Sequence, residues 1–130
     1  MGARKKEMAD RLKEERKSTA IASLNNYPSS PRKMRLVADI IRGKEVVAAL
    51  NILKFTRKHS ALPMEKLLRS AISNWQAKNN GEDITAANVV VKDIRVDVAR
   101  TLKRISPAPQ GRAHRIRKRS NHVTIILDKK

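Results

Sequence analysis

The chain of 130 residues contains no cysteine and only three aromatic residues, Tyr27, Phe55 and Trp75. Without cysteine it has no disulfide framework, no thiolate nucleophile and no zinc ribbon, which fits a reducing compartment. Modules that stack single-stranded bases on aromatic side chains need several exposed rings, and this chain has too few to build such a platform. If it binds nucleic acid, it must do so through phosphates, sugars and shape.

Long apolar runs are missing as well. No stretch approaches the roughly 20 apolar residues that cross a membrane, and the N-terminus has no apolar run of the signal-peptide kind. The first residues are rich in lysine and arginine, but acids interrupt them, whereas a transit peptide is poor in acids. These acids are Glu7, Asp10, Glu14 and Glu15. We therefore expect a cytoplasmic protein with no membrane partner.

Acidic residues are the third scarcity. The 12 acids stand against 30 lysines and arginines, which gives a formal net charge of +18. Self-repulsion on this scale opposes compaction, so we expect the chain to reach its full structure beside a polyanion. Its length suits a single domain with a modest core.

The positive charge is densest in residues 100–119, which hold eight arginines and lysines and no acid. The only large apolar residues there are Leu102, Ile105 and Ile116, too few to offset the entropy of ordering the segment. Alone, this segment should be mobile. It requires a partner with dense negative charge, and nucleic acid supplies that charge.

Two runs of alternating apolar and polar residues, 88–98 and 121–127, flank this segment and predict an antiparallel pair of strands. The residues expected on the apolar faces are Val90, Ile94, Val96 and Val98 in the first run and Val123, Ile125 and Leu127 in the second. The connection, residues 98–120, is predicted to form an extended hairpin finger. About 11 residues per arm, at roughly 3.3 Å each, would reach on the order of 35 Å. Pro107, Pro109 and Gly111 mark its tip.

Three helices are predicted ahead of these strands. The first starts at a Ser29 or Ser30 cap with Pro31 in its first turn and ends at Gly43, the second runs from Glu45 to about Phe55, and the third from near Ser60 to Asn79. Aliphatic residues at helical spacing predict their core faces. These faces are Met34, Val37, Ala38 and Ile41, widened by Leu36 and Ile40; Val46, Val47, Ala49, Leu50 and Leu53; and Met64, Leu67, Leu68, Ala71, Ile72 and Trp75.

The segments before the first helix have weaker patterns. Residues 1–18 mix both charge signs and are interpreted as a basic N-terminal extension, partly disordered or helical, with a solvated tail of no role as the alternative. Ser18–Asn26 reads either as an edge strand or as an extended lead-in. Residues 19–130 would form a single globular domain. The fold class expected is α+β: three helices packed on a small antiparallel sheet, with a long protruding basic β-hairpin.

Catalytic chemistry finds little support. The histidines, His59, His114 and His122, lack the spacing of a metal site, and the sequence contains no phosphate loop or nucleophile elbow. His122 is better read as a structural hydrogen-bonding residue. Asp93 and Asp97 are expected to pair with nearby arginines rather than to act as an acid and a base. We expect no enzyme activity, no metal and no cofactor.

Basic residues also crowd the start of the first predicted helix, where the helix dipole disfavours them. Arg32, Lys33 and Arg35 there, and Arg42 near the end, would suit phosphate contacts, but ordinary solvated side chains explain them equally well. A compact helical core with a separate basic ribbon fits threading between packed RNA helices, since DNA-reading folds usually place a helix in the major groove. The alternative function is a DNA-compacting protein of the nucleoid.

Specific residues point to one family. The run SPRKMRLVADIIRGK (30–44) resembles the first-helix signature of the universal family of large-subunit ribosomal protein twenty-two, bacterial type. Further segments resemble the same family, the most specific lying between Gly111 and Thr124; they are ALNIL (49–53), LRSAISN (68–74), LKRI (102–105), GRA (111–113), RIRKR (115–119) and HVT (122–124). Together they cover roughly residues 20–128.

The resemblance implies a structural protein that binds large-subunit ribosomal RNA of the 23S type, contacts several of its domains and assists subunit assembly. It also implies that the hairpin lines the peptide exit tunnel, with Ser106, Pro107, Ala108, Pro109 and Gln110 at a tip beside the nascent peptide. Neighbouring large-subunit proteins are further partners, and no homo-oligomer is expected. The candidate RNA-binding residues are Arg32, Lys33, Arg35, Arg42, Lys44, Arg100, Lys103, Arg104, Arg112, Arg115, Arg117, Lys118 and Arg119.

The chain departs from the family pattern at two places. Ala99-Arg100 stands where the family commonly has Gly-Pro before the ribbon, so a different bend is expected there. At the tip, Ala108, Pro109 and Gln110 replace residues that are usually basic. This predicts a stiffer, less positive loop facing the tunnel.

Overall fold

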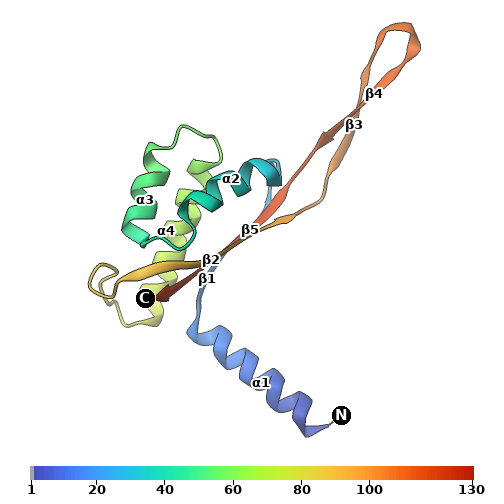
Figure 1. Ribbon diagram of the computed structural model, residues 1–130. Helices are drawn as coiled ribbons and strands as arrows, with labels where there is room; N and C mark the ends of the chain where they lie inside the picture. Colours follow the sequence, from blue (N-terminus) through green and yellow to red (C-terminus); the bar gives the residue numbers. More distant parts are fainter. Residues whose placement is uncertain (1) are drawn as a thin grey trace.

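A computed structural model describes residues 2–130 (Figure 1). Its helices are α1 (Ala3–Ser18), α2 (Pro31–Ile41), α3 (Val46–Phe55) and α4 (Ala61–Lys78). Its strands are β1 (Ala20–Tyr27), β2 (Val89–Val98), β3 (Leu102–Pro107), β4 (Ala113–Lys118) and β5 (Asn121–Lys129), with a 3-10 turn, η1 (Pro109–Gly111), between β3 and β4.

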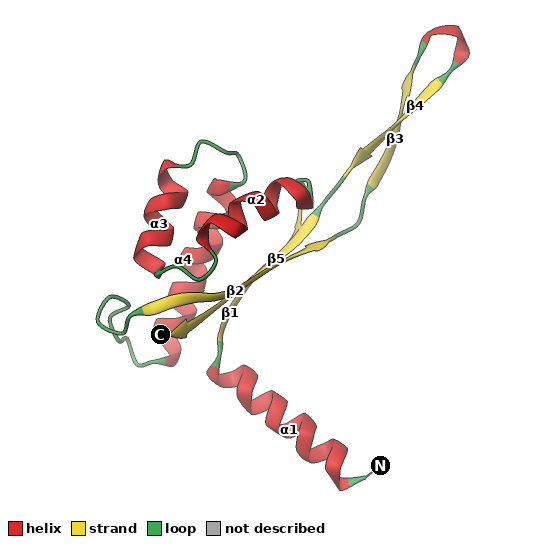
Figure 2. Cartoon of the chain, in the orientation of Figure 1, coloured by secondary structure: helices red, strands yellow, loops and turns green. Residues whose placement is uncertain are grey.

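Five strands form two antiparallel sheets (Figure 2). In the larger sheet, β5 lies in the middle between β1 and β2, so Ile125 of β5 is opposite Ala22 on one side and Ile94 on the other. Helices α2, α3 and α4 pack against this sheet and form the body of the molecule. Strands β3 and β4 pair only with each other and project away from the body as a hairpin.

The α+β class and the antiparallel hairpin are confirmed, but residues 2–130 form four α-helices rather than the three predicted. The fourth is α1, where only partial helix was expected. Opposite charges at helical spacing, such as Glu7 and Arg11, support that helix locally. At β1, the edge-strand reading of residues 18–26 is the correct one, because β1 pairs along β5 at one side of the sheet.

Local sequence explains the bounds of α2. Pro31 occupies its first turn, where the missing N–H costs nothing, and Gly43 beyond its end has a φ of 73°, a conformation that glycine adopts without strain. The predicted core face is buried: Met34, Val37, Ala38 and Ile41. The predicted widening of that face is wrong, since Leu36 and Ile40 are 53% and 38% exposed.

The predicted apolar face of β2 is also partly wrong. Val89 and Val91 are buried at the start of the strand, and Ile94 and Val96 further on, whereas Val98 is exposed. A β-bulge between Val91 and Asp93 accounts for this change of phase, because one extra residue turns every later side chain to the other face. The bulge therefore explains why Val90 is misplaced. Val98 keeps the phase of Val96 but is exposed where the large sheet ends.

The core lies between the larger sheet and the three helices α2, α3 and α4. Its largest fully buried side chains include Met64 and Leu68 of α4 and Ile125 of β5, and Trp75 is also buried. At the edge of the core, Asn121 is completely buried, and its Nδ2 donates a hydrogen bond of 2.8 Å to the carbonyl oxygen of Ser29. This bond ties the loop before α2 to the first residue of β5.

An exposed ion pair joins β2 to β5, between the Lys92 ammonium and the Asp128 carboxylate. The hydrogen bond from Lys92 holds the pKa of Asp128 below its ordinary value, and the same bond raises the pKa of Lys92. Among residues 2–130, no helix is both long enough and apolar enough to cross a membrane.

Candidate nucleic-acid interface

The hairpin, hereafter the finger (residues 98–120), extends the strands of the body. The backbone N–H of Ala99 donates to the carbonyl oxygen of Ser120 at 2.9 Å, which bridges the gap between the two sheets. Beyond it, β3 and β4 pair from Leu102 opposite Lys118 to Pro107 opposite Ala113. The two continuous arms predicted from the sequence are thus interrupted at residues 99–101 and 119–120, where the large sheet ends and the finger sheet begins.

Like charges face each other across the finger. Lys103 lies directly opposite Arg117, and on the same face the next pair is Ile105 opposite Arg115. Three cations therefore share one face of a two-stranded ribbon around a single aliphatic side chain. Like charges directly opposite each other destabilise a strand pair, and residues 98–120 contain no acid to offset them. An external anion would remove this repulsion.

The second face of the finger is less crowded. Arg104 pairs with Ile116 there, and Lys118 pairs with Leu102. No side chain of β3 or β4 is buried, and Ile105 is 72% exposed. A two-stranded ribbon of this kind has almost no packing of its own and is marginally stable in water.

The tip is a short 3-10 turn closed by two backbone bonds. The N–H of Ala108 donates to the carbonyl oxygen of Arg112 at 2.8 Å, and the N–H of Arg112 donates to the carbonyl oxygen of Pro109 at 3.4 Å. Gln110 and Gly111 both have positive φ, 60° and 70°. The structure places Ser106 and Pro107 at the end of β3 and the remaining predicted tip residues, Ala108, Pro109 and Gln110, in the turn itself. None of these five side chains carries a charge.

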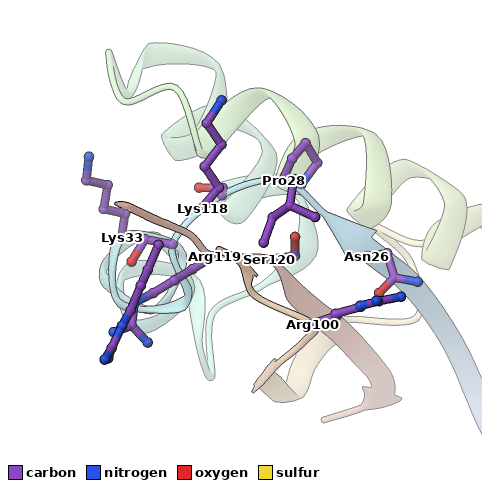
Figure 3. Close-up of a pocket in the computed structure, with 11 residues that line it drawn as sticks. Asn26, Pro28, Lys33, Arg100, Lys118, Arg119 and Ser120 are labelled. Carbon is purple, nitrogen blue, oxygen red and sulfur yellow. The ribbon is translucent and has the colours of Figure 1, made fainter. Parts of the chain in front are cut away.

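A groove of about 810 Å³ lies at the base of the finger, where the finger meets the start of α2 (Figure 3). It brings together cations from segments far apart in the sequence, and these are Lys33, Arg100, Arg117, Lys118 and Arg119. Arg100 extends toward Asn26 on one side of the groove, while Lys33, Lys118 and Arg119 lie on the other. A groove lined by five cations is suited to a chain of phosphates.

Other predicted residues on α2 are held by the molecule itself. The guanidinium of Arg35 donates two hydrogen bonds to the carbonyl oxygen of Val96, at 3.1 and 3.3 Å. Arg42 donates to the Ile94 carbonyl oxygen at 2.9 Å and to Asp39 at 2.8 Å. Both arginines therefore fasten α2 to β2.

Arg32 and Lys44, at the two ends of α2, are exposed but do not line the groove. On the finger, Arg104 and Arg115 line a second, smaller hollow with Ile105 and Ile116, and Arg112 lies beside the tip.

Asn26 and Ser120 line the basal groove without having been singled out from the sequence. Asn26 has a φ of 53°, and its backbone N–H donates to Nδ1 of His122 at 3.1 Å, which confirms the structural role expected of that histidine. Asparagine tolerates this backbone conformation better than most residues. That preference is the one feature of the sequence that could have marked Asn26 as part of the groove.

Metal and acid–base chemistry receive no support from the described part of the chain. Within residues 2–130 no three histidines or acids are placed to hold a metal ion. Asp93 pairs with Arg95 at 2.8 Å, as expected, whereas Asp97 forms no ion pair within residues 2–130.

Comparison with known proteins identifies the family. The model of the family described as Ribosomal protein L22p/L17e matches residues 22–128. The chain belongs to this family. Its match covers the body and the finger and begins after α1.

Individual relatives agree with this assignment. The chain is 60% identical to the large ribosomal subunit protein uL22 of Christiangramia forsetii over 127 residues, 98% of this chain and 94% of the relative. It is 61% identical to the uL22 protein of Flavobacterium johnsoniae over 127 residues, 98% and 93% of the two chains. It is also 57% identical to that of Bacteroides fragilis strain YCH46 over 130 residues, 100% and 95% of the two chains.

Membership in the L22p/L17e family confirms the resemblance drawn from residues 30–44 and 111–124. It also confirms the expectations of a large-subunit ribosomal protein that is not an enzyme.

Proposed function

We propose that this chain is a structural component of the large ribosomal subunit that binds 23S-type ribosomal RNA through the finger and the groove at its base. In this role it assists assembly of the subunit in the cytoplasm, and the finger lines the peptide exit tunnel. Its partners are several domains of the ribosomal RNA, neighbouring large-subunit proteins and the nascent peptide.

The pairing of Lys103 with Arg117 is the observation that carries this proposal. The finger has like charges opposite each other, no acid and no buried side chain. Interactions within such a two-stranded ribbon are too weak to keep it folded. RNA phosphates beside the ribbon would each attract one cation of the pair, so the repulsion between Lys103 and Arg117 would be replaced by two attractive contacts. Arginine also suits this task, because its planar fork binds two phosphate oxygens at once.

The predicted RNA contacts then fall into four sets. The finger supplies Lys103, Arg104, Arg112 and Arg115, and the groove supplies Lys33, Arg100, Arg117, Lys118 and Arg119. Arg32 and Lys44 would contact RNA beside α2. Arg35 and Arg42 have donors to spare after their bonds to β2, and we propose that each bridges the body and a phosphate.

The tip would contact the nascent peptide. Ser106, Pro107, Ala108, Pro109 and Gln110 are the segment farthest from the body, and their lack of charge suits a surface past which chains of any sequence must move. Two prolines and the two backbone bonds between residues 108–109 and Arg112 restrict the motion of this turn.

The proposal is tested by removing three finger cations together. We expect Arg112→Gln/Arg115→Gln/Arg119→Gln to weaken binding of the full chain to ribosomal RNA. The slope of log K against log salt should fall by about 2 to 3, since each phosphate contact contributes about 0.7 to 0.9. The matched control is Lys54→Gln/Arg57→Gln/Lys58→Gln, which removes the same charge from exposed positions outside the groove and finger.

Equal loss in the two triple variants would mean that net charge, rather than the finger, governs binding. Sucrose-gradient fractionation of a cell lysate supplies the second readout, because the parent chain should sediment with the large subunit. Duplex DNA as competitor tests the nucleoid alternative, which requires DNA to bind at least as tightly as folded RNA.

A further inference from the structure

Helix α1 belongs neither to the body nor to the finger. It points away from the body, on a different side from the finger, and none of its residues is buried (Figures 1 and 2). Its contacts with the body are at its C-terminal end, where the Lys78 ammonium donates to the backbone carbonyl oxygens of Arg16 and Thr19. At about 1.5 Å per residue, its 16 residues extend roughly 24 Å.

The charges of α1 are sorted around its axis. With about 100° between successive residues, five cations fall on one face that covers roughly a third of the circumference. They are Lys5, Lys6, Lys13, Arg16 and Lys17, and Ala9 lies at the middle of this face. We call this set the cationic face of α1.

All four acids of the helix lie outside the cationic face, and they are Glu7, Asp10, Glu14 and Glu15. The two remaining cations, Arg4 and Arg11, lie among these acids, where opposite charges at helical spacing offset them. An ion pair reaches the cationic face at one edge, between Lys13 and Asp10 at 3.7 Å. The helix therefore presents one strongly positive face, while the rest of its circumference carries four acids against two cations, a net charge of −2.

We infer that the cationic face of α1 is a second RNA-binding surface that docks on the phosphate backbone of ribosomal RNA. This inference rests on the proposed function. Lys13 and Lys17 are four residues apart on the same face, a spacing at which like charges destabilise a helix. A row of phosphates along the face removes that repulsion and stabilises a helix that has no packing of its own.

Two other partners fit α1 less well. A membrane surface requires a broad apolar face, and the only large apolar residues here are Met8 and Leu12, both exposed. A protein partner with a hydrophobic groove would lack anchors for the same reason. The sorting of charge favours a partner that is negative throughout, which is the property of an RNA backbone.

A pair of double variants tests this inference on the full chain. Lys6→Gln/Lys13→Gln removes two charges from the cationic face, and Arg4→Gln/Arg11→Gln removes two from the opposite face. Both lower the net charge equally, and glutamine keeps a similar helix propensity. We expect the first variant to lower the log–log salt slope of ribosomal RNA binding by about 1.4 to 1.8 and the second to leave it nearly unchanged.

Directed cleavage identifies what lies against the face. Because the chain has no cysteine, Ala9→Cys and Glu7→Cys each introduce one unique thiol, on the cationic face and on the opposite face. An iron chelate tethered to these thiols in assembled large subunits should cut ribosomal RNA more strongly from position 9. Stronger cuts from position 9 together with a slope change only in the Lys6/Lys13 variant support the inference.

Equal slopes in the two double variants, or equal or absent RNA cuts from position 9 and position 7, would overturn it. Cleavage of a neighbouring protein from position 9, with no RNA cut, would overturn it in favour of a protein partner. Failure of the proposed function would be seen separately, as the absence of the parent chain from the large-subunit fraction.

Discussion

The body and the finger of this protein are both built from antiparallel strands, yet different forces hold them. In the body, β5 lies between two neighbours and its alternate side chains are completely or almost completely buried. In the finger, β3 and β4 have one neighbour each and no buried side chain. The body is thus stabilised from within by apolar burial, whereas the finger depends on charge supplied from outside.

This difference assigns stability to the larger sheet and RNA binding to the finger sheet that follows it along the chain. Substitutions in the body should change the free energy of unfolding, and substitutions in the finger should change affinity for RNA. Three experiments test how completely the two effects separate.

Truncation of a core side chain should have the largest effect. Leu68→Ala removes a side chain that is 0% exposed and should destabilise the body by about 2 to 5 kcal/mol. Urea unfolding followed by the fluorescence of Trp75, the single tryptophan, measures this change. The matched variant in the finger is Ile105→Ala, which should shift the same transition by less than about 0.5 kcal/mol because its side chain is already exposed. A larger shift would show that the finger packs on the body.

Removal of the repulsion in the finger should have an intermediate effect. It should stabilise the free hairpin and weaken its binding to RNA. Arg117→Thr leaves Lys103 without a like charge opposite and should stabilise the free hairpin by about 0.2 to 1 kcal/mol. Amide hydrogen exchange of β3 and β4 should therefore slow, while the log–log salt slope of RNA binding falls by about 0.7 to 0.9.

Lys118→Thr is the matched control for this variant. Lys118 faces Leu102, so its loss should lower the salt slope equally without slowing exchange. Equal slowing of amide hydrogen exchange in the two variants would rule out a specific repulsion between Lys103 and Arg117.

Loss of the ion pair between β2 and β5 should have the smallest effect. The pKa of Asp128 is lowered in the folded chain, so its carboxylate adds stability above its ordinary pKa and loses that contribution as pH falls through the lowered value. Asp128→Asn should therefore destabilise the body slightly at neutral pH and not at all at acid pH. The urea midpoint of unfolding, measured at a series of pH values, shows this change. Asp83→Asn, which removes an exposed acid outside the ion pairs of residues 2–130, should show no such trend. A difference in urea midpoint between Asp128→Asn and the parent chain that stays the same at every pH would show that the ion pair with Lys92 does not stabilise the body.

Much of the body could be predicted from the sequence, because its signals are local. The spacing of Met64, Leu68 and Trp75 is enough to define α4 and its buried face. The errors arise where pairing decides the outcome. The bulge at Val91–Asp93 exists only in relation to β5, and no residue there is of a type that marks a bulge in a single sequence.

The candidate site was predicted by residue but not by arrangement. Charge density predicted a basic segment, the alternating runs on either side predicted that it forms a hairpin, and Pro107, Pro109 and Gly111 marked its tip. The groove at its base could not be foreseen, since Lys33 and Arg100 meet only when α2 packs on the end of the sheet. For the same reason, the bonds of Arg35 to Val96 were invisible in the sequence.

The way the finger joins the body has a mechanical consequence. β4 passes into β5 through residues 119–120 alone, and β5 is bonded on both edges, to β1 and to β2. A pull on the tip reaches β2 through residues 99–101 as well as β5, so the two strands move together. It therefore loads the hydrogen bonds between β5 and β1 in shear, across their own direction, and many must break together before the strand slides. The row of hydrogen bonds between β1 and β5 thus resists a force on the tip as a unit, and not one bond after another.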